Sequence, residues 1–144
     1  MTTNGTAPPN PAETLSNDND LSAGAVDFMV LHCLEIADDD GEHDLIVELI
    51  DLYLADAIDR LGAIAVAISN KDSESLKRST HVFKGSSSSL GAVQLAVDCE
   101  RMQGLADDGA WAKIQTLYRA LQDEFVRVRR TLIAEREVRQ RCDY

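Results

Sequence analysis

The sequence predicts an all-α fold, an antiparallel four-helix bundle with an additional short helix near the N-terminus. Ala, Leu, Ile and Val are frequent, whereas aromatic residues make up only 5 % of the 144 residues. Apolar residues recur at alternating steps of three and four, which is typical of amphipathic helices, and no segment shows the period-two alternation of a strand. Helices of this kind, joined by short turns, bury their apolar stripes against one another in a bundle.

The elements follow from local composition. Residues 1–20 are rich in Thr, Asn, Pro, Asp and Ser, which predicts a disordered tail ahead of one domain over residues 21–144. In that domain we expect helices over about 23–36, 42–69, 73–90, 92–106 and 111–136, with the first and shortest laid across one end of the bundle. Asp72 or Ser73 is expected to cap the third helix, and Gly91 to end it.

The charge of the chain excludes several classes of partner. The formal net charge is -11, which argues against nucleic acid and against an anionic membrane surface. The chain begins without the pattern of a signal peptide and contains no apolar run long enough to span a bilayer. Its three cysteines are isolated, which favours reduced thiols. We therefore expect a cytoplasmic protein, with the nucleus as a further location in a eukaryote.

The arginines that crowd residues 127–141 are interpreted as the solvated end of a long helix, because cations suit a helix C-terminus.

The third helix carries a polar face around His81. At about 100° per residue, His81 lies opposite the apolar stripe of that helix and therefore faces solvent. Lys84 follows one turn later and Lys77 and Arg78 add positive charge, while Gly85 and Ser88 remove bulk beside the imidazole. Ser86 and Ser87 flank the buried stripe, where their hydroxyls are expected to bond back to backbone carbonyls.

Two interpretations of this face remain open from spacing alone. An exposed neutral imidazole has a free lone pair that can attack an electrophilic phosphorus, and a nearby ammonium would offset the charge of the phosphoryl group. A surface histidine in a patch of mixed charge is the alternative. A phosphate-binding loop is excluded, because "FKGSSSSLG" lacks the Gly-Lys-Ser/Thr ending and follows no strand. Three scattered histidines and unpaired cysteines provide no metal-ligand spacing, so no metal is expected.

The stretch "STHVFKGSSSSLGA" at 79–92 closely resembles the signature of the histidine-containing phosphotransfer (HPt) family. That signature is a histidine followed by x-x-Lys-Gly, small residues, an apolar residue and glycine. "VDCERMQGLA" at 97–106 is similar to the next helix of the yeast-type phosphorelay intermediates of this family, and "LEIADDD" at 34–40 is similar to the same relatives. The resemblance covers roughly residues 25–135.

The resemblance implies a four-helix bundle that accepts a phosphoryl group from an aspartyl phosphate on one receiver domain and passes it to another. His81 would be the phosphoacceptor, Lys84 would stabilise the phosphoryl group, and Gly85 would leave room for the receiver. Gln103, which follows His81 by 22 positions, would hydrogen-bond to the imidazole or the phosphate from the neighbouring helix. Mg²⁺ would belong to the partner receiver, so no cofactor is expected in this chain.

The partners implied are the receiver domains of a hybrid histidine kinase and of a response regulator, and the chain is expected to be a monomeric carrier without kinase activity. Phe28, Leu31 and Ile36 are expected to dock these receivers, with Lys77 and Arg78 beside them; the alternative is that the apolar three only cover the end of the bundle. Two other functions are alternatives: an adaptor that binds receivers without carrying phosphate, and the dimerisation module of a sensor kinase. The latter usually has an acidic residue directly after its histidine, where this chain has Val82.

Overall fold

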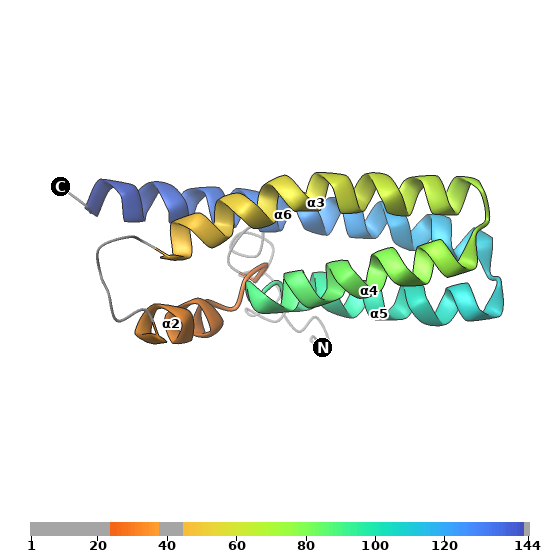
Figure 1. Cartoon of the computed structure of the whole chain (residues 1–144), viewed down its shortest axis with the longest axis horizontal. Helices are drawn as coiled ribbons and strands as arrows, with labels where there is room; N and C mark the ends of the chain where they lie inside the picture. Colours follow the sequence, from red (N-terminus) through yellow and green to blue (C-terminus); the bar gives the residue numbers. More distant parts are fainter. Residues whose placement is uncertain (1–23, 38–44, 143–144) are drawn as a thin grey trace, which may run out of the picture.

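The structure, a computed structural model, describes residues 24–37 and 45–142, and the chain is helical over most of these ranges (Figure 1). The helices are α2 (Phe28–Ala37), α3 (Leu45–Ser69), α4 (Ser73–Ser89), α5 (Val93–Asp108) and α6 (Trp111–Cys142). No strand occurs within the described ranges. The four long helices run antiparallel and contact one another in the order α3, α4, α5, α6 around the bundle. The predicted all-α bundle with an extra short helix is confirmed, whereas the predicted tail lies outside the described residues.

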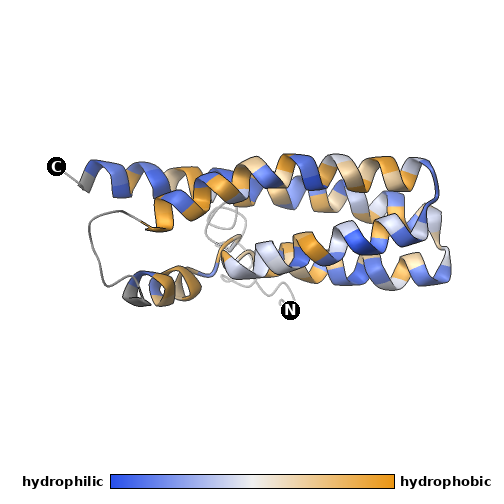
Figure 2. Cartoon of the chain, viewed as in Figure 1, coloured by the Kyte–Doolittle hydropathy of each residue, from blue (hydrophilic) through white to orange (hydrophobic). Residues whose placement is uncertain are grey.

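The core consists of the apolar stripes that the sequence pattern identifies. At its centre the rings of Tyr53, Phe83 and Phe125 lie 6.1 to 6.4 Å apart. Fully buried aliphatic side chains extend this core along the bundle, from α3 (Ile50, Ile64), α4 (Leu76), α5 (Leu95, Met102) and α6 (Ile114, Leu121, Leu132). Each contributes about 1.5–3 kcal/mol by leaving water. Figure 2 shows the resulting alternation of hydrophobic and hydrophilic residues along the long helices.

The two ends of α4 have sequence-encoded boundaries. Asp72 is the N-cap, and its carboxylate accepts a hydrogen bond from the backbone N–H of Ser75 at 3.1 Å. At the other end Gly91 adopts a φ of +82°, which favours glycine. A Cβ at this position would lie 2.6 Å from the backbone oxygen of Asp27. Gly91 therefore ends α4 and also lets the chain before α2 pack directly on this turn.

The N-terminal helix is shorter than predicted. It begins at Phe28 instead of Ala23, because the carboxylate of Asp27 accepts a hydrogen bond from the backbone N–H of Met29 at 3.0 Å and so caps the helix there. The residues just before it, Ala25 and Val26, are buried in the core as irregular chain. Asp27 also donates its backbone N–H to the Gly91 carbonyl at 2.7 Å, which anchors the start of α2 at the end of α4.

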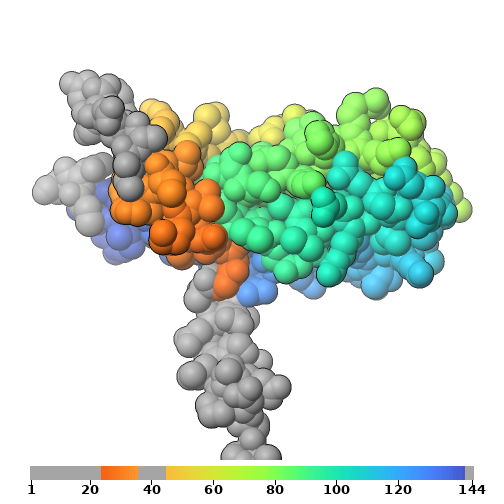
Figure 3. All heavy atoms as spheres, turned by 90° about the horizontal axis from the view of Figure 1, so that it is seen from below, coloured from red at the N-terminus to blue at the C-terminus, as the bar shows by residue number. Residues whose placement is uncertain are grey.

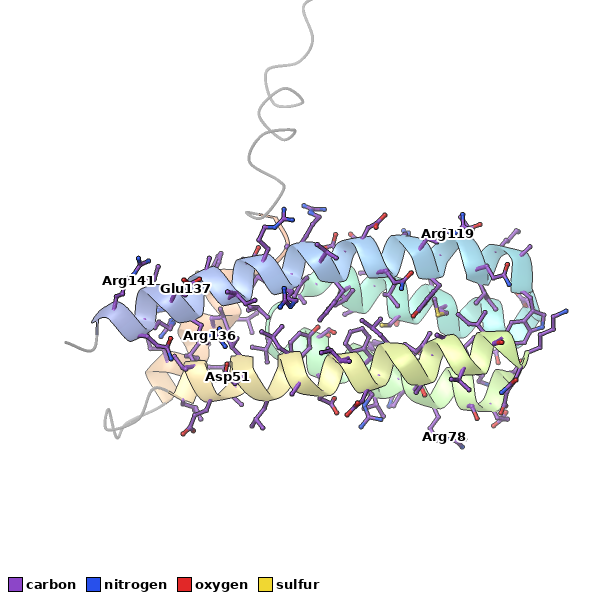
Figure 4. The ribbon with its side chains drawn as sticks, turned by 90° about the horizontal axis from the view of Figure 1, so that it is seen from above. Asp51, Arg78, Arg119, Arg136, Glu137 and Arg141 are labelled. Atoms are coloured by element: carbon purple, nitrogen blue, oxygen red, sulfur yellow. The ribbon has the colours of Figure 1, made fainter. Side chains whose placement is uncertain are left out.

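The last helix is longer than predicted, ending at Cys142 instead of near Arg136, and its arginines are more than a solvated helix end. Arg136 donates to Asp51 of α3 at 2.7 Å, a pair that Figure 4 shows between the two helices. Arg139 bonds Glu35 of α2 at 2.9 Å and Glu135 at 2.7 Å. Through these contacts the extra turns of α6 bind α2 and α3. The interpretation of this segment as only a solvated helix end is therefore corrected.

Candidate functional site

His81 lies in the middle of α4 and is exposed, as the helical periodicity predicts. Leu76 and Phe83, on the opposite side of the same helix, are fully buried. Because a capped helix that packs on the core carries the imidazole, the position of His81 relative to the bundle is fixed by core packing and not by a loop.

The neighbouring helix α5 packs antiparallel against α4, and two side-chain contacts establish the register. The hydroxyl of Ser73 donates to the carbonyl of Ala106 at 3.1 Å. The amide of Gln103 donates to the carbonyl of Lys77 at 3.3 Å. Gln103 therefore hydrogen-bonds to the backbone of α4 at Lys77, one turn before His81. The resemblance implied a hydrogen bond to the imidazole or the phosphate instead.

Lys84 forms an ion pair across the interface between α4 and α5. Its ammonium lies 2.8 Å from the carboxylate of Glu100 on α5. The hydrogen bond from Lys84 holds the pKa of the Glu100 carboxyl below its usual range, so Glu100 is charged at neutral pH. Sequence reasoning identified Lys84 but missed Glu100, because the two residues belong to different helices and only the interhelical register brings them together.

The other two cations near His81 also have partners. Lys77 lies 2.7 Å from the carboxylate of Asp107, and this hydrogen bond raises the pKa of Lys77. Arg78 donates to the hydroxyl of Ser75 at 3.3 Å and lies on the α3 side of α4. The three cations of the sequence pattern thus flank His81 on the same helix, and two of them are held by carboxylates of α5.

The small residues around His81 leave its surroundings open. A Cβ placed on Gly85 would have no atom within 4 Å, so packing does not require glycine there. Ser88 is exposed, and Ser86 bonds back to the Phe83 carbonyl at 3.2 Å as expected. Ser87 differs from the expectation: its hydroxyl pairs with the buried Tyr53 hydroxyl at 2.8 Å, because the Tyr53 side chain of α3 reaches it in the core.

The apolar residues expected to dock a partner separate into different environments. Phe28 is exposed, with 43 % of its surface accessible, but Leu31 is 1 % exposed and belongs to the core. The prediction that Leu31 docks a receiver is therefore wrong, because α2 turns this side chain towards the bundle. Ile36 lies within α2, but its side chain is outside the part of the chain that the structure describes.

Further exposed apolar residues border the same surface and were missed. Met29, beside Phe28, is 67 % exposed, and Val93 and Val97 of α5 are exposed as well. Figure 3 shows that α2, α4 and α5 contribute to one face of the molecule. The signal was present in the sequence, since Val97 lies outside the apolar stripe predicted for this helix and therefore faces solvent. We call Phe28, Met29, Val93 and Val97 the apolar border of the His81 site.

Two negative findings concern the described residues only. No three His, Cys, Asp or Glu side chains gather there in a group that could hold a metal ion. No helix within the described ranges is long and apolar enough to cross a membrane.

Comparisons with known proteins agree with this geometry. The model of the Hpt domain family matches residues 48–131, a span that includes His81. Histidine-containing phosphotransfer protein B (HptB) from Pseudomonas aeruginosa PAO1 is 31 % identical and superposes with a TM-score of 0.72, over 81 % of this chain and 97 % of that one. ZmHP2, a histidine-containing phosphotransfer protein from maize, is 20 % identical with a TM-score of 0.76, over 92 % of this chain and 98 % of that one.

No curated protein matches the sequence. Neither of these two structures is from yeast, so the resemblance to yeast-type intermediates stays a prediction. The match covers more than half of the chain and the bundle superposes on a relative over nearly that relative's whole length. This chain therefore belongs to the Hpt domain family.

Proposed function

We propose that this histidine phosphotransfer protein carries its phosphoryl group on His81, as the intermediate between two receiver domains of a phosphorelay. The observation that carries the proposal is an exposed imidazole at the centre of a rigid helix, with Lys84 one turn away and open space over Gly85. The other histidine whose side chain the structure describes, His32, is also exposed but pairs with the carboxylate of Glu35 at 3.6 Å. The same carboxylate is bonded by Arg139 at 2.9 Å, so His32 belongs to an ion-pair network that holds α2 to α6.

The atoms of the transfer step come from the imidazole of His81 and the aspartyl phosphate of the receiver. The lone pair of one imidazole nitrogen attacks phosphorus, and the P–N bond forms as the P–O bond of the acyl phosphate breaks. The electron pair of the broken bond leaves with the receiver's aspartate carboxylate, and the second ring nitrogen keeps its proton. The Lys84 ammonium offsets the charge of the arriving phosphoryl group. We propose that Mg²⁺ is held by the receiver and not by this chain.

The apolar border gives the receiver a place to dock. The Asp27–Gly91 hydrogen bond places Phe28 and Met29 at the end of α4, and Val93 follows Gly91 by two residues on α5. Exposed apolar residues on the same face as a reactive group are typical of an interaction surface. We propose that the receiver packs on this border and on the open backbone at Gly85, which brings its aspartyl phosphate to His81.

A carrier is favoured over a kinase dimerisation module by the composition of the bundle. One chain supplies all four long helices, α3 to α6, so no second copy is needed to complete the core. We propose that the protein acts as a monomer that binds the receiver of a hybrid histidine kinase and then that of a response regulator.

The experiment is transfer from a phosphorylated receiver in the presence of Mg²⁺. The wild-type chain should acquire a phosphate that is labile in acid and stable in base. The His81→Gln variant should acquire none, and the matched His32→Gln variant should be labelled like the wild type. Label that persists in His81→Gln would refute the assignment, and binding of the receiver without any label would favour the adaptor function instead.

A further inference from the structure

We propose that Glu100 sets how strongly the chain retains the phosphoryl group, by competing with that group for Lys84. This inference rests on the proposed function of His81 and adds a positioning residue to it. Glu100 lies on α5, outside the segment that carries the phosphoacceptor, and its carboxylate contacts Lys84 at 2.8 Å.

The register of α4 and α5 places Glu100 close to the level of His81 along the bundle. Gln103 contacts the backbone of Lys77, and the helices are antiparallel with the same rise per residue. Three residues back along α5 from Gln103 therefore correspond to three residues forward along α4 from Lys77. That brings Glu100 to the level of Thr80, which directly precedes His81.

Side-chain direction brings the ammonium of Lys84 to the same level. Helical side chains lean towards the N-terminus of their own helix, so Lys84 leans back over the turn that contains His81. Lys77 leans away from His81, towards the start of α4. Its partner Asp107 lies there, next to the Ser73–Ala106 contact. Of these two lysines, Lys84 is thus the one that leans towards the turn containing His81, and Glu100 is its partner.

A phosphoryl group on His81 would change the balance of charge at this point. The Glu100 carboxylate and the phosphoryl oxygens are both anions that Lys84 can bind, so occupation of the ammonium by one weakens its contact with the other. The Lys84–Glu100 pair is partly exposed, with 36 % and 68 % of the side chains accessible. An exposed pair of this kind shifts an equilibrium by a factor of about two to five.

As a consequence, Lys84 stabilises the phosphohistidine less than it would if Glu100 were absent. Such a site favours release of the phosphoryl group to the next receiver. Removing the carboxylate should therefore trap phosphate on the carrier without changing the nucleophile.

The experiment measures the equilibrium ratio of phosphorylated chain to phosphorylated receiver for the full-length protein. Glu100→Gln should shift this ratio towards the phosphorylated chain by a factor of about two to five at low salt, and the shift should shrink in high salt. Asp107→Asn is the matched control, because it removes the same charge and an equivalent ion pair from the same helix. It should leave the ratio within a factor of about 1.5, since Lys77 leans away from His81.

A second pair of variants tests the competition itself. In a Lys84→Gln background, Glu100→Gln should shift the ratio by much less than in the wild type, because the ammonium for which the anions compete is gone. An unchanged ratio in Glu100→Gln, an equal shift in Asp107→Asn, or a full shift without Lys84 would each overturn the inference. If instead no variant and no wild-type chain accepts phosphate, the proposed function of His81 fails and not the role of Glu100.

Discussion

Replacing Gly91 with alanine is expected to loosen α2 from the bundle and, through α2, to weaken receiver docking. Two features of the structure make this glycine sensitive. Its φ of +82° lies in the left-handed region, and a Cβ there would lie 2.6 Å from the Asp27 oxygen. Asp27 cannot retreat without lengthening its 2.7 Å hydrogen bond to the Gly91 carbonyl.

The expected loss of stability in Gly91→Ala is the sum of two free-energy costs. An alanine in the left-handed region costs about 1–2 kcal/mol relative to glycine. Loss of the Asp27–Gly91 hydrogen bond adds about 0.5–1.5 kcal/mol. Gly109 provides the matched control: it has a φ of +64°, but no atom lies within 4 Å of its Cβ position. Gly109→Ala should therefore incur only the backbone cost of about 1–2 kcal/mol.

The assay is urea denaturation of both variants, together with receiver affinity. We expect Gly91→Ala to lower the free energy of unfolding by about 1 kcal/mol more than Gly109→Ala does. Gly91→Ala should also weaken receiver binding, because Phe28 and Met29 are displaced, whereas Gly109→Ala should leave it unchanged. Equal destabilisation by the two variants, with equal receiver affinity, would refute the reasoning about the Asp27 contact.

Three further predictions concern the site and the core. Gly85→Gln should slow phosphoryl transfer by covering His81, while the helix itself gains about 0.5–1 kcal/mol; unimpaired transfer by a fully folded variant would contradict the role of open space at Gly85. Tyr53→Phe should cost about 1–3 kcal/mol by leaving the Ser87 hydroxyl unpaired, and adding Ser87→Ala should recover most of it in urea denaturation, whereas strictly additive losses would argue against their hydrogen bond. Burial raises the pKa of the Cys99 thiol to about 12, so at pH 8 alkylation mapped by mass spectrometry should modify exposed Cys33 and spare Cys99 until the protein unfolds; rapid native labelling of Cys99 would contradict its burial.

The helical stripes made most of the fold predictable. Residues such as Ile50, Leu95 and Leu121 lie at helical spacing, and the structure buries all three. The position of α2 was harder, because its cap depends on Asp27 and its packing depends on Gly91, which is distant in sequence. A short helix with apolar residues on several sides does not reveal which of them faces the core.

In the candidate site, too, residues that share one helix were predictable from the sequence, whereas contacts between helices were not. His81, Lys84 and Gly85 share one helix, so periodicity alone placed them on one exposed face. Glu100 could not be found in this way, because its contact with Lys84 depends on the register of two helices. Arg139 was likewise missed as an anchor of α2, since its partner Glu35 lies at the other end of the sequence.

The central claim is that His81 passes a phosphoryl group from one receiver to another, and a reconstituted relay tests it most directly. A labelled, phosphorylated first receiver is mixed with this chain, Mg²⁺ and a second receiver, and label on each protein is followed over time. We predict that label appears transiently on the wild-type chain and then on the second receiver, and that neither step occurs with His81→Gln. Label that reaches the second receiver equally well through His81→Gln would contradict the claim.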